Sequence, residues 1–214
     1  MAVIYVNGLR TEYTYDKNGN MLTAVYPDGT SESFSYDAEE NLISLTSVTG
    51  KTVKYEYDKL SRNTKITNAL GDSCYYKYDE KSLLISSTDY NGNKYSFEYD
   101  ENGNCTKMIF PDKAFAATEY DIRGRIIKET DQMGSATEYA YDNLDRLVKI
   151  TDNNGSSWNY TYDEQGNITS VTDPMGNKTQ YFYDSLGRNI KTVLPLGMYS
   201  ENVYDNDSNL VSEL

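Results

Sequence analysis

The sequence has no histidine among its 214 residues, one tryptophan, Trp158, and two cysteines, Cys74 and Cys105. Without histidine, Ser-His-Asp and Cys-His catalytic arrangements are excluded, as are zinc sites that use histidine. We therefore expect no enzymatic activity, no cofactor and no metal site. The cysteines should lie three strands apart in the sheet inferred below, roughly 14 Å, which is beyond the reach of a disulfide. Both are predicted to be free thiols.

Positive charge is also scarce, because 20 Lys and Arg stand against 33 Asp and Glu, which gives a net charge of −13. Phosphate backbones and anionic membrane surfaces both require a cationic partner. Apolar runs long enough to span a bilayer are missing, and the N-terminal MAVIYVNGLR is too short to be a signal peptide. The sequence therefore predicts no nucleic-acid partner and no membrane insertion.

Tyrosine, in contrast, is abundant, with 22 copies, and ten of them belong to Tyr-Asp pairs spaced by 21 residues. Near-copies such as YDENGNC (99–105), YDEQGNI (162–168) and YDSLGRN (183–189) show the repeat. A strict period without insertions indicates a repeat architecture. The pairs are Tyr15 and Asp16, Tyr36 and Asp37, Tyr57 and Asp58, Tyr78 and Asp79, Tyr99 and Asp100, Tyr120 and Asp121, Tyr141 and Asp142, Tyr162 and Asp163, Tyr183 and Asp184, and Tyr204 and Asp205.

Each repeat carries two turn signals. A looser one lies three residues after the Asp and holds Gly, Ser, Glu or Asp, residues that include good turn formers. The stricter one is a glycine thirteen residues after the Asp, which Lys113 replaces once. These glycines complete the predicted structural repeat signature: Gly29, Gly50, Gly71, Gly92, Gly134, Gly155, Gly176 and Gly197.

Between the turns lie two short segments rich in Val, Ile, Thr and Tyr, of which 147–151 and 137–142 are examples. Alternate tyrosines such as Tyr139 and Tyr141 share one face of a strand. Each repeat is therefore predicted to be a β-hairpin, and the short connections make successive hairpins one antiparallel meander. The fold class is all-β, with two strands per repeat, coiled into an open spiral or shell segment because long sheets twist.

A propeller is the alternative architecture, with two repeats forming one four-stranded blade. It is disfavoured because inner and outer strands of a blade would repeat every 42 residues, whereas Tyr-Asp recurs every 21. In the meander, the tyrosines are expected to stack as a ladder on equivalents two strands away and on the intervening aliphatic side chains. The aspartates are expected to accept backbone N–H groups and begin the turns that glycine completes.

With these motifs in place, the chain resembles the RHS or YD-repeat family from Asn7 to Leu214, most closely in YDSLGR (183–188) and VTDPMGNKTQYFYD (171–184). The resemblance implies a hollow β-spiral shell, as in bacterial insecticidal toxin complexes, polymorphic toxins, large bacterial surface proteins and animal teneurins. In toxin members the shell wraps a C-terminal effector, which a self-cleaving aspartate module releases. Nothing like that module is present here, so encapsulation and cleavage carry over only to a parent protein.

The most direct functional interpretation is a passive structural segment of a secreted or cell-surface bacterial protein. Residues 7–15 match the second half of a repeat and 209–214 the first half of another. We therefore expect residues 1–214 to be one array of about ten repeats, truncated at both ends. Its expected partners are the rest of the parent chain, including flanking repeats and an encapsulated effector, and other copies through edge-to-edge association of exposed strands.

Two other functions compete with this interpretation. The segments DKNGN (16–20), DENGN (100–104) and DNNGS (152–156) resemble the beginning of calcium loops, but calcium needs more oxygen ligands than they offer, so Asx-type turns are favoured. Carbohydrate binding is the stronger alternative, because exposed aromatic side chains on a repetitive sheet can stack on sugars. Trp158 or exposed tyrosines would then form the adhesion site.

The sixth repeat departs most from the pattern. Lys113 replaces the turn glycine, and Thr118 stands where a Tyr or Phe is usual. We predict a local bulge, a missing ring or an altered turn there.

Overall fold

The computed structural model describes residues 2–4 and 10–213, so residues 7–9 of the half-repeat expected at 7–15 lie outside the described part. Six-residue strands that end at the Tyr of a Tyr-Asp pair alternate with five-residue strands rich in β-branched residues. The strands are β1 (Ala2–Ile4), β2 (Arg10–Tyr15), β3 (Met21–Val25), β4 (Ser31–Tyr36), β5 (Leu42–Thr46), β6 (Thr52–Tyr57), β7 (Asn63–Thr67), β8 (Ser73–Tyr78), β9 (Leu84–Thr88), β10 (Lys94–Tyr99), β11 (Cys105–Ile109), β12 (Phe115–Tyr120), β13 (Ile126–Thr130), β14 (Ala136–Tyr141), β15 (Leu147–Thr151), β16 (Ser157–Tyr162), β17 (Ile168–Thr172), β18 (Lys178–Tyr183), β19 (Asn189–Val193), β20 (Tyr199–Tyr204) and β21 (Leu210–Glu213).

The all-β prediction with two strands per repeat is confirmed. The described residues contain no α-helix and a single 3-10 turn, η1 (Pro195–Gly197). Within the same residues, no helix has the length and apolar character needed to cross a membrane.

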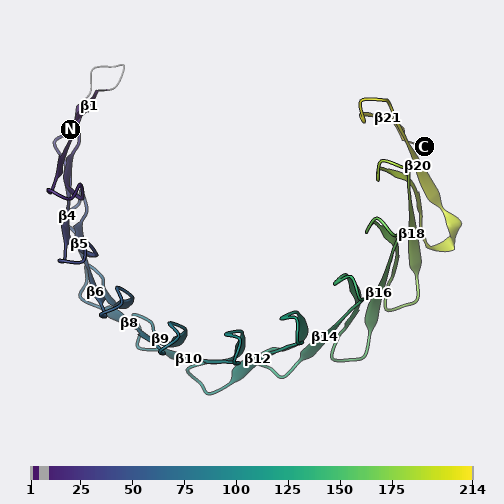
Figure 1. Cartoon of the computed structure of the whole chain (residues 1–214), viewed down its shortest axis with the longest axis horizontal. Helices are drawn as coiled ribbons and strands as arrows, with labels where there is room; N and C mark the ends of the chain where they lie inside the picture. Colours follow the sequence, from purple (N-terminus) through teal and green to yellow (C-terminus); the bar gives the residue numbers. More distant parts are fainter. Residues whose placement is uncertain (1, 5–9, 214) are drawn as a thin grey trace. The chain divides into compact units, whose positions relative to one another are not determined.

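The chain divides into two compact units, and both are antiparallel meanders. Unit 1 comprises Met1–Glu98 and Met108–Lys113, and unit 2 comprises Tyr99–Lys107 and Ala114–Leu214. In unit 1 every strand pairs with the next from β1 to β10, and in unit 2 the same holds from β12 to β21 (Figure 1). Because pairing continues past every fourth strand, neither unit is built from propeller blades.

Turns of the same kind join the strand ends along both long sides of the sheet, and these two sides are called its edges here. At one edge, called the YD edge, Asp163 N–H donates to the Asn167 carbonyl at 3.0 Å and Gly166 N–H to the Asp163 carbonyl at 3.2 Å. At the other, called the glycine edge, Asp152 and Gly155 make the equivalent bonds. Both are type I turns followed by a left-handed residue, a common hairpin closure. In five YD-edge turns the residue three positions after the Asp is not glycine, yet it still adopts a φ between 57° and 67°. These residues are Glu40, Ser61, Ser82, Asp145 and Ser208.

The two edges differ in strand register. Between β14 and β15, Ala140 pairs with Lys149 but Tyr141 pairs with Leu147, so Val148 is an extra residue beside the Tyr-Asp pair. Hairpins closed at the glycine edge, such as β15 and β16, stay in register. A bulge at one edge in each repeat bends the strands there and increases their twist.

The prediction of an irregular sixth repeat is wrong for the backbone. Lys113 has a φ of 76° and its N–H donates to the Phe110 carbonyl at 3.0 Å, so the lysine adopts the geometry of the glycine it replaces. The bulge between β12 and β13, at Glu119 and Tyr120, is the one that the other YD hairpins have. The ring that is usual at Thr118 is absent, as it also is at Asn202 in the last repeat.

Each unit is a single layer with two unlike faces. The pairing places Tyr139, Ile150 and Trp158 in one row, and this side is called the aromatic face. Ala140, Lys149 and their neighbours lie on the opposite, polar face. Among the described residues, only Ala24 and Cys74 are apolar and buried, so the sheet lacks the core that a chain of this length can form. Both cysteines are free, as predicted.

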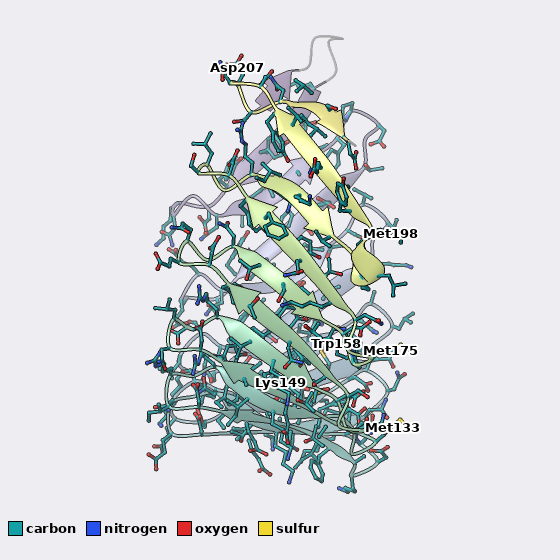
Figure 2. All side chains as sticks on the ribbon, turned by 90° about the vertical axis from the view of Figure 1, so that its right-hand side faces the viewer. Met133, Lys149, Trp158, Met175, Met198 and Asp207 are labelled. Atoms are coloured by element: carbon teal, nitrogen blue, oxygen red, sulfur yellow. The ribbon has the colours of Figure 1, made fainter. Side chains whose placement is uncertain are left out.

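Apolar side chains project from the turn tips. In unit 2, Met133, Met175 and Met198 follow one another along the glycine edge (Figure 2), and the first two are 91% and 86% exposed. Ile122 and Leu186 occupy similar positions at the YD edge and are 97% and 70% exposed. Both edges therefore present apolar groups that the sheet itself does not cover.

Candidate functional site: the junctions at the YD edge

The aspartate of each Tyr-Asp pair organises its own turn. Asp100 Oδ1 accepts the N–H groups of Asn102 and Asn104, both at 2.9 Å, and Oδ2 accepts the Asn104 side-chain amide at 2.9 Å. The Asn104 amide lowers the pKa of Asp100, and the backbone N–H groups add to this, while desolvation opposes it. A carboxylate that accepts several N–H groups favours its ionised form, so it is an anion at neutral pH.

The loops considered for calcium use their first carboxylate in the same way. Asp16 Oδ1 accepts two backbone N–H groups at 2.9 Å, and Asp152 Oδ1 accepts two at 2.9 Å and 2.8 Å. These contacts are those of Asx-type turns, which supports that interpretation of the sequence. Among the described residues, no three His, Cys, Asp or Glu side chains converge as metal ligands.

The tyrosine of the pair connects its repeat to the preceding one. Tyr162 Oη donates to the Leu147 carbonyl at 2.7 Å, and Tyr183 Oη donates to the Ile168 carbonyl at 2.9 Å. The acceptor always lies 15 residues earlier, where the bulged strand begins. The same bond is made by Tyr36 to Met21, Tyr57 to Leu42, Tyr120 to Cys105 and Tyr204 to Asn189.

At four tyrosines of the Tyr-Asp pairs, two of which (Tyr162 and Tyr204) also make this hydrogen bond, an arginine lies over the ring where the ladder prediction placed another tyrosine. Arg146 Cζ is 4.7 Å from the Tyr162 ring centroid. Its Nε donates to Asp142 Oδ2 at 2.7 Å, and one terminal nitrogen donates to the Asp163 carbonyl at 2.7 Å. The guanidinium thus joins the turn of its own repeat to the next turn and the next ring. Equivalent arginines are Arg62 over Tyr78, Arg125 over Tyr141 and Arg188 over Tyr204.

Three of these arginines also bind the left-handed residue of the next turn. Arg62 donates to Ser82 Oγ at 3.1 Å, Arg125 to Asp145 Oδ1 at 2.7 Å and Arg188 to Ser208 Oγ at 3.2 Å. A positive φ costs a non-glycine residue free energy. The hydrogen bond from the preceding repeat offsets part of that cost at these positions.

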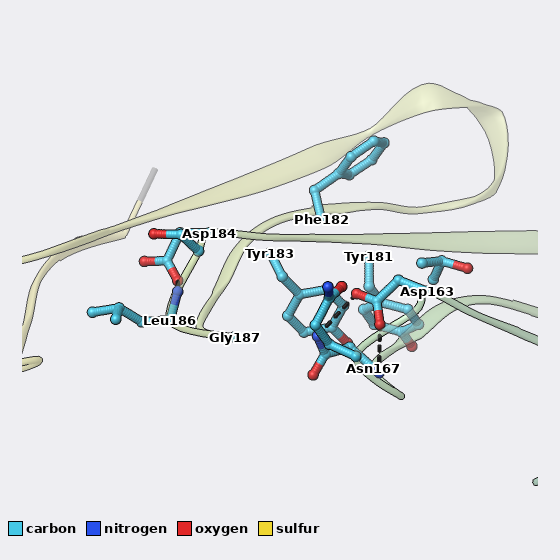
Figure 3. A pocket seen from close by; sticks show the side chains of 11 residues that line it. Asp163, Asn167, Tyr181, Phe182, Tyr183, Asp184, Leu186 and Gly187 are labelled. Carbon is cyan, nitrogen blue, oxygen red and sulfur yellow. Dashed lines mark hydrogen bonds between the residues drawn. The ribbon is translucent and has the colours of Figure 1, made fainter.

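Where asparagine replaces the arginine, its side chain stays within its own turn, and at two such junctions a hollow remains. Asn167 Nδ2 donates to Asp163 Oδ2 at 2.9 Å. The hollow beside it has a volume of about 740 Å³ and is lined by Asp163, Tyr183 and Asp184, among others. Figure 3 shows Asn167, Asp163 and the Tyr181 and Tyr183 rings on one side of the strand, with Phe182 on the other. A second hollow of about 330 Å³ lies beside Asn41 and Tyr57.

The missing ring of the sixth repeat also leaves a hollow, on the aromatic face. It has a volume of about 360 Å³ and is lined by Thr118, Glu129 and Thr137, among others. Glu129 replaces the usual aliphatic residue of its row, and Tyr139 Oη donates to Glu129 Oε2 at 2.6 Å. This hydrogen bond to the carboxylate, followed by desolvation, raises the pKa of Tyr139 to about 12.

The exposed aromatic side chains are distributed over both faces. Trp158 is 38% exposed on the aromatic face, opposite Ile150. On the polar face, Phe182 and Tyr199 are 45% and 58% exposed and lie on either side of Lys191. Lys191 Nζ is 4.0 Å from the Tyr199 ring centroid and 2.6 Å from Glu201 Oε1.

The role of the arginines was not anticipated from the sequence. A signal was present, because the position four residues after each Asp holds Arg or Asn in nine of ten repeats, with Leu83 as the exception. Its meaning depends on the distance between consecutive turns across the sheet, which only the folded geometry provides.

The meander, the paired turns and the tyrosine contacts define an array of β-hairpin repeats. A family model described as RHS Repeat matches residues 78–114, 120–157, 145–177 and 162–197, which together exceed half of the chain, and one described as Teneurin YD-shell matches residues 2–80. The chain belongs to the RHS/YD-repeat family, as the sequence motifs predict. No curated protein matches the chain.

Solved structures share the fold at low sequence identity. The crystal structure of TcdB2-TccC3-Cdc42 has a TM-score of 0.59 and 15% identity, over 100% of this chain and 15% of that one. The structure of a Photorhabdus luminescens Tc holotoxin pore, which carries a TccC3 mutation, has a TM-score of 0.53 and 16% identity, over 99% of this chain and 15% of that one. The chain thus spans about 15% of the length of these relatives.

Proposed function

We propose that the chain is a structural wall segment of a large secreted or cell-surface bacterial RHS-repeat protein, without enzymatic activity. The observation that carries this proposal is the use of the recurrent polar residues at the YD edge. Each Asp shown above binds its own turn, and the tyrosines and arginines bind the neighbouring repeat. These side chains stabilise the array, and their spacing follows the repeat.

The remaining surface suits a part of a larger shell. A one-layer sheet with few buried residues and apolar turn tips has uncovered surface, which neighbouring parts of a parent chain would cover. In this proposal, flanking repeats continue the array of residues 1–214 on both sides. By analogy with the toxin relatives, the parent chain encloses a C-terminal effector. Isolated copies are expected to associate through their end strands, such as β21.

The test uses the longer chain that this proposal requires. Changing Tyr141 and Tyr162 to alanine removes two adjacent ring contacts with arginines and so loosens the wall. We expect the C-terminal segment of the parent chain to become sensitive to protease, while the unmodified parent protects it. A C-terminal segment that is equally sensitive in both proteins would contradict the wall function, as would specific turnover in panels of glycoside and peptide substrates.

Carbohydrate-mediated adhesion is the second candidate. It is favoured by Phe182 and Tyr199 flanking Lys191 and Glu201, since exposed rings beside polar groups can stack on sugars and bind their hydroxyls. On a glycan array, reproducible binding that is lost in Tyr199→Ala, Phe182→Ala or Trp158→Ala would establish adhesion. If no glycan binds, adhesion is contradicted and the wall function remains as the proposed function.

A further inference from the structure

The two hollows at the YD edge correspond residue by residue, although they lie in different units. Both occur where the residue four positions after the Asp is asparagine. The lining pairs are Asp37 and Asp163, Glu39 and Gln165, Asn41 and Asn167, Tyr57 and Tyr183, Asp58 and Asp184, and Lys59 and Ser185. This recurrence links the hollow to the asparagine at these two junctions.

At arginine junctions a guanidinium occupies the equivalent place. Arg146 lies over Tyr162 and donates to Asp142 Oδ2 and to the Asp163 carbonyl. One repeat later, the corresponding groups are the Tyr183 ring, Asp163 Oδ2 and the Asp184 carbonyl. All three belong to residues that line the 740 Å³ hollow. At four junctions of this chain, therefore, such surroundings hold a guanidinium group.

We propose that the hollow beside Asn167 binds the guanidinium group of an arginine side chain from a partner polypeptide, in the place that Arg146 occupies one repeat earlier. The hollow beside Asn41 is a second site of the same kind. Both lie on a protein with a net charge of −13, which attracts a cationic partner. The sites do not depend on whether the chain forms a shell.

The acceptors retain capacity for an incoming donor. Asp163 Oδ2 accepts one hydrogen bond from Asn167, and a carboxylate oxygen can accept a second. The Asp184 carbonyl accepts the Gly187 N–H at 3.0 Å, just as the Asp163 carbonyl accepts both Gly166 and Arg146. The Asn167 side chain lowers the pKa of Asp163, so the carboxylate is charged at neutral pH.

The geometry favours arginine over lysine. A planar guanidinium can stack on the Tyr183 ring while its edge donates to two acceptors, whereas an ammonium acts as a point charge. The ring is already held in place because Tyr183 Oη donates to the Ile168 carbonyl. A platform fixed before binding reduces the entropy lost on association.

The test is an NMR titration of the whole chain with N-acetyl-arginine amide, with N-acetyl-lysine amide as the matched control. We expect saturable shifts at the Tyr183 ring, the Asn167 side-chain amide and the Tyr57 ring, with a Kd of about 1 mM. The lysine probe should bind roughly tenfold more weakly. No saturable shift at Tyr183, or equal binding of both probes, would overturn the proposal.

Substitutions at two junctions sharpen the test. Asn167→Arg supplies the guanidinium internally, so the shifts at Tyr183 should disappear while those at Tyr57 remain. Arg146→Asn empties an occupied junction and should create new shifts at Tyr162. Asn167→Gln, which keeps the amide, should retain binding at Tyr183. If Arg146→Asn does not fold, the Asn167 variants still test the proposal. Binding of the arginine probe that persists at Tyr183 in folded Asn167→Arg would contradict the assigned site.

Discussion

Arg146 and Asn167 occupy equivalent positions in consecutive repeats, yet they close the YD edge differently. Arg146 leaves its own turn and contacts Tyr162 and the Asp163 carbonyl of the next repeat. Asn167 donates to Asp163 in its own turn and leaves a hollow toward Tyr183. Since the turn hydrogen bonds are the same in both cases, the turn does not require the arginine. Contacts between repeats can therefore vary along the array without changing its backbone.

The comparison also shows how some left-handed turn residues that are not glycine are supported. Ser82, Asp145 and Ser208 each follow an arginine junction and accept a hydrogen bond from its guanidinium. The correspondence is not strict, because Gly166 follows Arg146, and Glu40 and Ser61 follow Asn20 and Asn41. Where an arginine does precede a non-glycine residue, it supplies a partner that offsets part of the cost of a positive φ.

The largest effect should come from lowering the pH, because acid protonates the turn aspartates that both junction types share. The pKa of Asp163 is lowered first by the Asn167 side chain, and that of Asp142 first by the backbone N–H of Arg146. Both aspartates have a pKa in the folded state that lies below the ordinary value of 3.8. Their ionised forms therefore stabilise the fold above pH 3.8, and this stabilisation is lost as the pH falls through the folded-state pKa. The urea midpoint, followed by circular dichroism, should be flat above about pH 5 and fall steeply below about pH 4.

Asp163→Asn provides the control for the acid prediction. It removes one titrating group and keeps the shape of the side chain, so the fall in the urea midpoint at low pH should be shallower. A midpoint that does not change between neutral pH and strong acid would show that these carboxylates do not stabilise the fold.

The second largest effect should come from removing a ring. Tyr162→Ala loses the hydrogen bond to Leu147, ring burial and the contact with Arg146, and should lower the free energy of unfolding by about 3 kcal/mol. Tyr183→Ala loses an equivalent hydrogen bond but no such arginine contact, and should cost about 2 kcal/mol. Urea denaturation measures both. Equal losses would mean that the guanidinium adds nothing to the ring contact.

Phenylalanine variants isolate the hydroxyl group. Tyr162→Phe and Tyr183→Phe should each cost about 1 kcal/mol, because both remove one hydrogen bond to a backbone carbonyl. If the two phenylalanine variants lose the same free energy of unfolding, the difference between the alanine variants comes from the contact of Arg146 with the Tyr162 ring.

Exchanging the two junction types gives the next effect in size. Arg146→Asn should lower the free energy of unfolding by about 1–2 kcal/mol through loss of the ring contact and of the bond to the Asp163 carbonyl. Asn167→Arg should raise it by up to about 1 kcal/mol, because the arginine finds the same partners in the next repeat. Thermal unfolding of the pair checks the opposite signs. A loss in both variants would show that each junction is adapted to its own residue.

The sequence was sufficient to predict the strands and turns because their determinants are local. Alternating tyrosines indicate a strand face, and residues that tolerate positive φ indicate turns, so the hairpin repeat is visible in one 21-residue unit. Lys113 shows the limit of this reasoning. The neighbouring hairpins hold that turn in the common geometry, so the replacement of glycine does not alter the backbone.

The contacts between repeats were less predictable. The hydroxyl of Tyr162 and the guanidinium of Arg146 contact groups 15 and 17 residues away, and the bulge beside each Tyr-Asp pair sets that register. A sequence pattern shows that positions recur, but it does not show which positions face each other across a bulged sheet. The ladder was therefore predicted from tyrosine rings and the aliphatic side chains between them, whereas the four rings described above have an arginine over them.

The smallest effect tests the left-handed residues. Glu40 has a φ of 67° and follows Asn20, so the preceding repeat provides no arginine to bind it. Glu40→Gly should raise the free energy of unfolding by about 0.5–1 kcal/mol, because relief of the strained backbone exceeds the added entropy of the unfolded chain. Ser82 has the same φ but accepts a hydrogen bond from Arg62. Ser82→Gly should change stability by less than about 0.5 kcal/mol, since the lost bond offsets the relief.

A double-mutant cycle of Ser82→Gly with Arg62→Ala, measured by urea denaturation, separates the lost hydrogen bond from the relief of backbone strain. Without Arg62, Ser82→Gly should become stabilising by about the same amount as Glu40→Gly, whereas an unchanged effect would show that the arginine does not support the serine.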